Sequence, residues 1–175
     1  MKKIIIYTIT AFVCFSLSDI NAQQPIKPAD WGSYNFLIGE WIGDGSGAPG
    51  QGSGSFTFSF DLQKRVLIRK GYTDFPKAGD KPAFRHDDLM IVYQENDKTK
   101  AVYWDNEGHA INYLVEFSQD KNKLYFTSEI VPSSPRFRLI YEKLSDGRIN
   151  NIFEIAMPGK PDQFNKYIEG IVKKK

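Results

Sequence analysis

The chain contains only two histidines, His86 and His109, and both are close in sequence to carboxylates. His109 follows Asp105 across the turn-forming stretch Asn106-Glu-Gly108. If this stretch joins two paired strands, Asp105 and His109 face each other, and a carboxylate that orients an imidazole is suited to proton transfer. Asp105 and His109 are therefore the candidate catalytic residues, for chemistry of the isomerase or lyase type. The alternative interpretation is a polar turn at the rim of the fold.

The spacing patterns of common metal and nucleophile sites are missing from the sequence. Neither histidine belongs to an H-x-H or H-x-x-x-H pair, so no metal ion is predicted. A metal site could still be drawn from both histidines and one nearby acidic residue. Those acidic residues are Asp87, Asp88, Asp105 and Glu107. No G-x-S-x-G motif is present, and the one cysteine, Cys14, lies in an apolar N-terminal run, so a nucleophilic hydrolase is not supported.

Charged residues inside otherwise apolar segments are candidates for ligand contacts. Arg136 and Arg138 alternate with Phe137 and Leu139, so the two arginines share one face of a predicted strand. If that face points into a cavity, the arginines could clamp a carboxylate; if Phe137 and Leu139 point inward, the arginines are solvated outside. The complete set of candidate ligand-binding residues is Trp41, Arg69, His86, His109, Tyr113, Arg136, Arg138, Glu154 and Tyr167.

Alternation of apolar and polar residues predicts strands along nearly the whole chain after Trp41. The clearest case is the segment 55–62, in which Phe56, Phe58, Phe60 and Leu62 fall on one face. Short turns rich in Asn, Asp and Gly separate about ten such segments, so neighbouring strands are antiparallel. We therefore predict an all-β fold: a closed, antiparallel up-and-down barrel of about ten strands, because closure removes exposed sheet edges.

The segment before the first strand is predicted to plug the barrel. Residues 31–38 can form a short helical turn, and Gly39-Glu-Trp41 follows directly. A large ring such as Trp41 can fill the closed end, where strand side chains do not reach. The glycine-rich segment 43–54 lacks the lysine and the following helix of a phosphate-binding loop, so we predict a lid or a hairpin loop there.

The N-terminus has the features of an export signal. Lys2 and Lys3 precede an apolar run from Ile4 to Leu17, and the small residue Ala22 is a suitable cleavage point. We predict a signal peptide over residues 1–22, one domain over residues 23–175, and a periplasmic or secreted protein. The apolar run is too short to span a bilayer, so no membrane span is expected after cleavage. The formal net charge of +2 without a clustered basic face argues against a nucleic-acid partner.

Several segments resemble known barrel proteins. Phe36-Leu-Ile-Gly-Glu-Trp-Ile-Gly43, followed by a glycine-rich loop, resembles the opening of nitrobindin-like and other lipocalin-like barrels. Tyr103-Trp-Asp-Asn-Glu-Gly-His-Ala-Ile-Asn-Tyr113 and Pro135-Arg-Phe-Arg-Leu139 are similar to segments of a family of exported, calycin-like bacterial proteins. The resemblance implies haem binding through a histidine near the C-terminus. Because no histidine follows His109, no cofactor is predicted, although Tyr167 occupies that general region.

These observations favour an exported protein that binds a small apolar or amphipathic molecule. Two other functions are also compatible with the sequence. One is an enzyme that uses Asp105 and His109. The other is a structural or interaction module whose barrel is filled by aromatic rings, since the chain has 13 Phe and 9 Tyr.

Overall fold

A computed structural model describes residues 29–44 and 53–175 of the 175-residue chain. The predicted signal peptide, residues 1–22, and most of the glycine-rich segment, residues 45–52, lie outside the described residues. The predictions of a cleaved signal and of a lid therefore stay predictions. Within the described part, no helix is long and apolar enough to cross a membrane.

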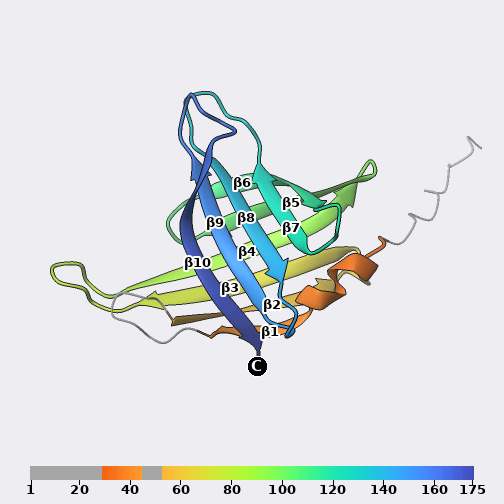
Figure 1. Ribbon diagram of the computed structural model, residues 1–175, viewed down its shortest axis with the longest axis horizontal. Coiled ribbons are helices and arrows are strands. Elements are labelled where there is room, and N and C mark those ends of the chain that lie inside the picture. The colour runs from red at the N-terminus through yellow and green to blue at the C-terminus, as the bar shows by residue number, and fades with distance from the viewer. Residues whose placement is uncertain (1–28, 45–52) are drawn as a thin grey trace, which may run out of the picture.

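The described chain forms a closed barrel of ten antiparallel strands in which each strand pairs with its sequence neighbours and β1 pairs with β10 (Figure 1). This confirms the predicted fold class. The strands are β1 Gly39–Gly43, β2 Ser53–Asp61, β3 Val66–Phe75, β4 Phe84–Glu95, β5 Lys98–Asp105, β6 Ala110–Phe117, β7 Lys123–Ser128, β8 Arg136–Lys143, β9 Ile149–Ala156 and β10 Phe164–Lys174.

The alternating apolar residues point into the barrel, as their period of two requires. Phe56 and Phe58 of β2 are buried, and both contact the ring of Tyr141 on the far wall. Leu62 differs from the prediction. It lies after the end of β2, in a turn where its φ is 48°, and its side chain is exposed. The strand therefore ends at Asp61, one residue earlier than the alternation of side chains predicts.

A 3-10 helix, η1 Gly32–Leu37, closes one end of the barrel, which confirms the predicted helical plug. Trp31, Tyr34 and Leu37 are buried there, and the rings of Tyr34 and Phe117 meet edge to face at 5.0 Å. The Trp41 ring on β1 lies directly behind the plug. Its indole Nε1 donates a hydrogen bond of 2.7 Å to the carbonyl of Leu37 and so ties the plug to the first strand.

The connections alternate between the two ends of the barrel, as an up-and-down topology demands. The β3–β4, β5–β6, β7–β8 and β9–β10 connections all lie at the end opposite η1 (Figure 1). We call this end the mouth. Loops at one end of a rigid barrel commonly carry the functional residues of such folds.

The bond between Trp41 and the plug gives a first prediction. Trp41→Phe keeps an aromatic ring but leaves the buried Leu37 carbonyl without its donor, so we expect a loss of roughly 1–3 kcal/mol in the free energy of unfolding. Trp104→Phe is the matched control, because Trp104 is exposed and a change within about 0.5 kcal/mol is expected there. Urea unfolding measures both, and equal midpoints for the two variants would contradict the role of this bond.

Candidate functional site

The inner face of the barrel divides into two halves that differ in packing. Toward the plug, the inward-facing residues are buried in one continuous core. They include Phe58, Leu67, Val92, Ala101, Val115, Leu124, Phe126 and Ile149. Toward the mouth, the inward-facing residues keep contact with solvent. They include His86, Tyr103, Ile111, Phe137, Phe153 and Ile155. The barrel is therefore packed at its closed end and accessible at its mouth.

An ion pair between Arg69 and Asp88 marks the boundary between the two halves. Arg69 Nη1 donates to Asp88 Oδ1, and the two side chains are only 10% and 5% exposed. The guanidinium also lies 4.8 Å from the centre of the Phe56 ring. Gly71 makes room for the pair, since a Cβ at this position would lie 2.8 Å from Asp88 Oδ2 and 2.9 Å from Arg69 Nη1. A buried pair of this kind is costly to break, because either partner alone would be an uncompensated charge.

Three inward-facing tyrosines surround the charge of Arg69. Burial raises the pKa of Tyr103, Tyr113 and Tyr141, and the nearby Arg69 guanidinium offsets part of that rise in each case. The three hydroxyls therefore stay protonated at neutral pH and can donate hydrogen bonds. The residues Arg69, Asp88, Tyr103, Tyr113 and Tyr141 are called the central polar group below.

Some interior polar atoms of this region have no hydrogen-bond partner among the described residues. They are Arg69 Nε, Tyr141 Oη and Asn151 Oδ1. Tyr141 and Asn151 are direct cross-strand partners in the β8–β9 ladder. Buried polar atoms are normally paired, and an unpaired one costs about 1–3 kcal/mol unless water or a ligand supplies the partner. All three atoms are fully buried, so only a water or a ligand group that enters the core could pair with them.

On the mouth side of the central polar group, the inner wall of the barrel is lined by apolar side chains that leave space between them. The rings of Phe137 and Phe153 stack at 5.9 Å, and Tyr167 meets Phe153 edge to face from a bulge in β10. Gly170 of β10 pairs with Asn151, so it faces inward. Among the described residues, no atom lies within 4 Å of the position that a Cβ on Gly170 would take. Within the described part of the chain, open space therefore lies in front of Gly170.

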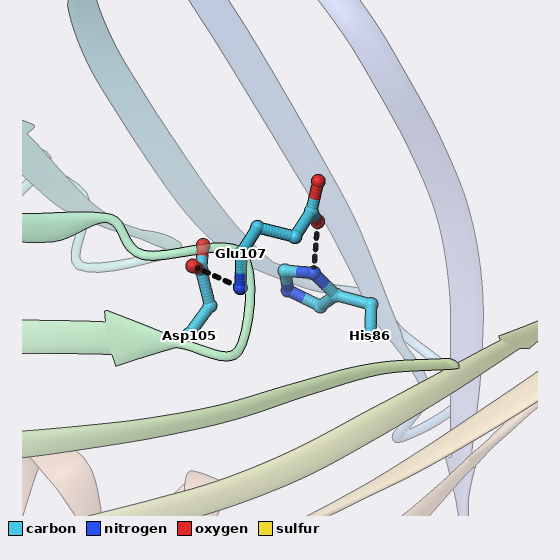
Figure 2. A group of neighbouring side chains, drawn as sticks. All are labelled: His86, Asp105 and Glu107. Atoms are coloured by element: carbon cyan, nitrogen blue, oxygen red, sulfur yellow. Dashed lines mark hydrogen bonds and ion pairs between the residues drawn. The ribbon is translucent and has the colours of Figure 1, made fainter. Parts of the chain in front are cut away.

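A second polar group, the rim cluster, sits at the mouth where β4 meets the β5–β6 turn. Figure 2 shows three of its members, with the His86 ring directed at the Glu107 carboxylate. His86 Nδ1 lies 2.7 Å from Glu107 Oε1, and His86 Nε2 lies 2.9 Å from the Tyr103 hydroxyl. The cluster comprises His86, Tyr103, Asp105, Glu107 and His109.

Asp105 and His109 come within hydrogen-bond reach, as the hairpin interpretation predicts. His109 Nδ1 lies 2.8 Å from Asp105 Oδ2, and the Asp105 side chain is only 4% exposed, whereas that of His109 is 54% exposed. Burial raises the pKa of Asp105, but the backbone N–H and imidazole of His109 and the N–H of Glu107 together outweigh burial and lower it. The carboxylate is therefore ionised, and the imidazole it orients stands largely in solvent.

The register of β8 answers the question of where its arginines point. Phe137, Leu139 and Tyr141 face the interior, so Arg136 and Arg138 lie on the outer face. Arg138 Nε donates a 2.6 Å bond to Glu154, its cross-strand partner, and Arg136 Nη1 donates to Asp162 at 2.8 Å. These partners engage both guanidinium groups on the outside, and Arg136, Arg138 and Glu154 are not brought to the mouth interior.

The remaining sequence-predicted residues fall at different depths. Arg69 and Tyr113 belong to the central polar group, His86 and His109 to the rim cluster, and Trp41 to the closed end. Tyr167 is 68% exposed at the β10 bulge. The sequence pointed to Asp88 and Glu107 only as possible acidic partners of a metal site, and Tyr103, Tyr141 and Asn151 were not among the candidate ligand-binding residues. Alternation could have placed Asp88 inside the barrel, because His86, Asp88 and Met90 share a face once β4 is extended back to Phe84.

Two surface hollows flank the mouth. One of about 550 Å³ is lined by residues of the β3–β4 hairpin, including Phe75, Phe84 and Arg85, and one of about 250 Å³ lies between the β7–β8 and β9–β10 connections. Ile130, Val131 and Met157 line the smaller hollow. The lining of neither hollow includes a residue of the central polar group.

Comparison with known proteins adds no family to this picture. No protein-family model matches the chain, and no match was found among curated proteins. The resemblance to calycin-like proteins therefore stays a prediction beyond the closed barrel itself.

The contact between Gly71 and the ion pair gives a second prediction. Gly71→Ala places a methyl group against Asp88 and Arg69 in a buried region, so we expect a loss of about 1–3 kcal/mol in the free energy of unfolding. Gly170→Ala is the matched control, because its added methyl group meets open space and a change within about 0.5 kcal/mol is expected. Urea unfolding distinguishes them; a Gly71→Ala variant as stable as Gly170→Ala would mean that the pair does not need this space.

Proposed function

We propose that this protein is an exported binding barrel that takes up a small amphipathic molecule through its mouth. The observation that carries the proposal is the contrast along the inner face: packed toward the plug, accessible toward the mouth. A barrel filled throughout by aromatic rings would bury the inward-facing residues at both ends. Ligand sites are typically concave and mostly apolar, with a few convergent polar groups, and the mouth half has this composition.

The two chemical parts of the mouth half support an amphipathic guest. The apolar body of such a molecule would lie against Phe137, Phe153 and Ile111. Its polar end would lie beside Tyr103, the tyrosine of the central polar group that keeps contact with solvent. Because Arg69 is already paired with Asp88, the site has little net positive charge and would bind the polar end of the ligand through hydrogen bonds. The ligand therefore does not have to be an anion.

The alternative of proton-transfer catalysis has one observation in its favour, the bond between Asp105 and His109. The imidazole is more than half exposed, however, and it stands at the rim outside the central polar group. Catalytic acids and bases are usually desolvated and in reach of a bound substrate. The exposure of His109 therefore makes binding the better supported function.

Export and calycin-like ancestry belong to the same proposal. Removal of residues 1–22 would leave the domain of residues 23–175 in the periplasm or outside the cell. The closed barrel and its plug are compatible with a lipocalin-like binding protein.

Filling the open space in front of β10 tests the proposal. Gly170→Phe puts a ring into the barrel, and Ile171→Phe puts the same ring on the outer face one residue later. With dodecanol and dodecanoate as probes in native mass spectrometry and calorimetry, we expect wild type and Ile171→Phe to bind one molecule. Gly170→Phe should bind at least about tenfold more weakly, a difference of about 1.4 kcal/mol.

The design separates loss of the site from loss of the fold. Circular dichroism and urea unfolding report whether Gly170→Phe is folded. Binding that is equal in the two phenylalanine variants would place the ligand outside the barrel. Absence of binding of either probe, and of the environment-sensitive dye anilinonaphthalene sulfonate, to folded wild-type protein would contradict the proposed function.

A further inference from the structure

The rim cluster brings together three donor groups of the kinds that bind transition metals. His86 comes from β4, Asp105 from the end of β5, and Glu107 from the β5–β6 turn (Figure 2). One donor atom from each lies within 4.8 Å of the other two. An imidazole nitrogen and two carboxylate oxygens bound to one ion at about 2.0–2.2 Å lie roughly 3–4 Å apart, so small side-chain rotations suffice.

We propose that His86, Asp105 and Glu107 bind a divalent transition-metal ion such as Zn²⁺ at the mouth of the barrel. Zinc sites with three protein ligands keep a further position open for water or another molecule. Here that position would face the mouth, since Glu107 lies on the solvent side of the cluster with its side chain 44% exposed. The proposal stands on the cluster itself and goes beyond the proposed binding of an amphipathic molecule.

Charge balance supports a cation at this point. Asp105 and Glu107 form their ion pairs with imidazoles. All the remaining acidic side chains that form ion pairs in the described part of the chain do so with an arginine or a lysine. Two carboxylates next to each other, one of them buried, repel unless a positive charge lies between them. A bound divalent ion would supply that charge in the place where both carboxylates and His86 converge.

Hydrogen bonds outside the three ligands hold them in position. The side chain of Asn106 accepts a bond of 3.0 Å from the backbone N–H of Asp87 and donates one of 2.8 Å to the carbonyl of Arg85. The backbone N–H of Asn106 donates to the Asp87 carbonyl at 3.1 Å. These bonds join the β5–β6 turn, which carries Glu107, to the residues of β4 directly before and after His86. The three donor groups are therefore brought together by the protein alone.

The second nitrogen of His86 has the partner that a ligating imidazole needs. Nδ1 faces Glu107, and Nε2 lies 2.9 Å from the Tyr103 hydroxyl. The hydroxyl oxygen can accept a hydrogen bond from the Nε2–H group. Metal-bound histidines nearly always use the other ring nitrogen in such a bond, which fixes the tautomer and the ring orientation. Asp105 is held in the same way, since its Oδ1 accepts from the backbone N–H groups of Glu107 and His109.

Metal titration of tag-free protein tests the proposal. Isothermal calorimetry with Zn²⁺ should show one site per chain in the wild type. His86→Gln and Glu107→Gln each remove a direct ligand, so each should weaken binding by at least about tenfold, because even outer-shell partners contribute that much. Asp87→Asn is the matched control: Asp87 follows His86 directly but faces outward and pairs with Arg85, so the affinity should be unchanged.

Other outcomes would overturn the site. Folded wild-type protein that binds no Zn²⁺ would do so. The same holds if His86→Gln binds as tightly as the wild type, or if Asp87→Asn weakens binding as much as Glu107→Gln. Mg²⁺ provides a further test, since it disfavours imidazole ligands. Equal affinity for Mg²⁺ and Zn²⁺ would show that surface carboxylates alone bind the ions.

Discussion

The pairing of β1 with β10 is the constraint on which the rest of the structure depends. Three residue pairs, Trp41 with Lys174, Ile42 with Lys173 and Gly43 with Val172, close the ladder. Once the ladder is closed, the register of every strand is coupled to that of its neighbours, and a shift by one residue would turn a whole strand inside out. This coupling places Arg69 inside and Arg138 outside, although each arginine directly follows an apolar residue, Ile68 or Phe137, in the sequence.

The closed ladder also explains why the two ends of the barrel differ. At the plug end, η1 adds Trp31, Tyr34 and Leu37 to the volume between the strands, and the core there is complete. At the mouth, no comparable element of the described chain enters the barrel, and the inward-facing residues stay accessible. Polar and charged groups are tolerated in this half because solvent or a guest can satisfy them, whereas in the packed half they would be costly.

Sequence reasoning predicted the fold well because alternation is a local signal. The strands around Phe56, Tyr113 and Leu139 could be read from neighbouring residues alone, and all ten are present. The direction of each face was harder, since it depends on pairing between distant segments, and the side on which Arg136 and Arg138 lie followed only from the register. Of the candidate site, His86, His109 and Asp105 were found by residue type. Asp88 and Glu107 were named only as possible acidic partners, and the contacts of Asp88 with Arg69 and of Glu107 with His86 depend on pairing between distant strands.

The central polar group and the rim cluster share Tyr103, and this links the two proposed sites physically. Its ring lines the accessible half beside Tyr113, at 6.4 Å between centres, and its hydroxyl lies 2.9 Å from His86 Nε2. A guest that contacts the hydroxyl would compete with His86 for it, and an ion on His86 Nδ1 would strengthen the bond from Nε2 to Tyr103 by making that N–H more acidic. Occupancy of one site would then change the affinity of the other, and the coupling would be equal in both directions, as linkage requires.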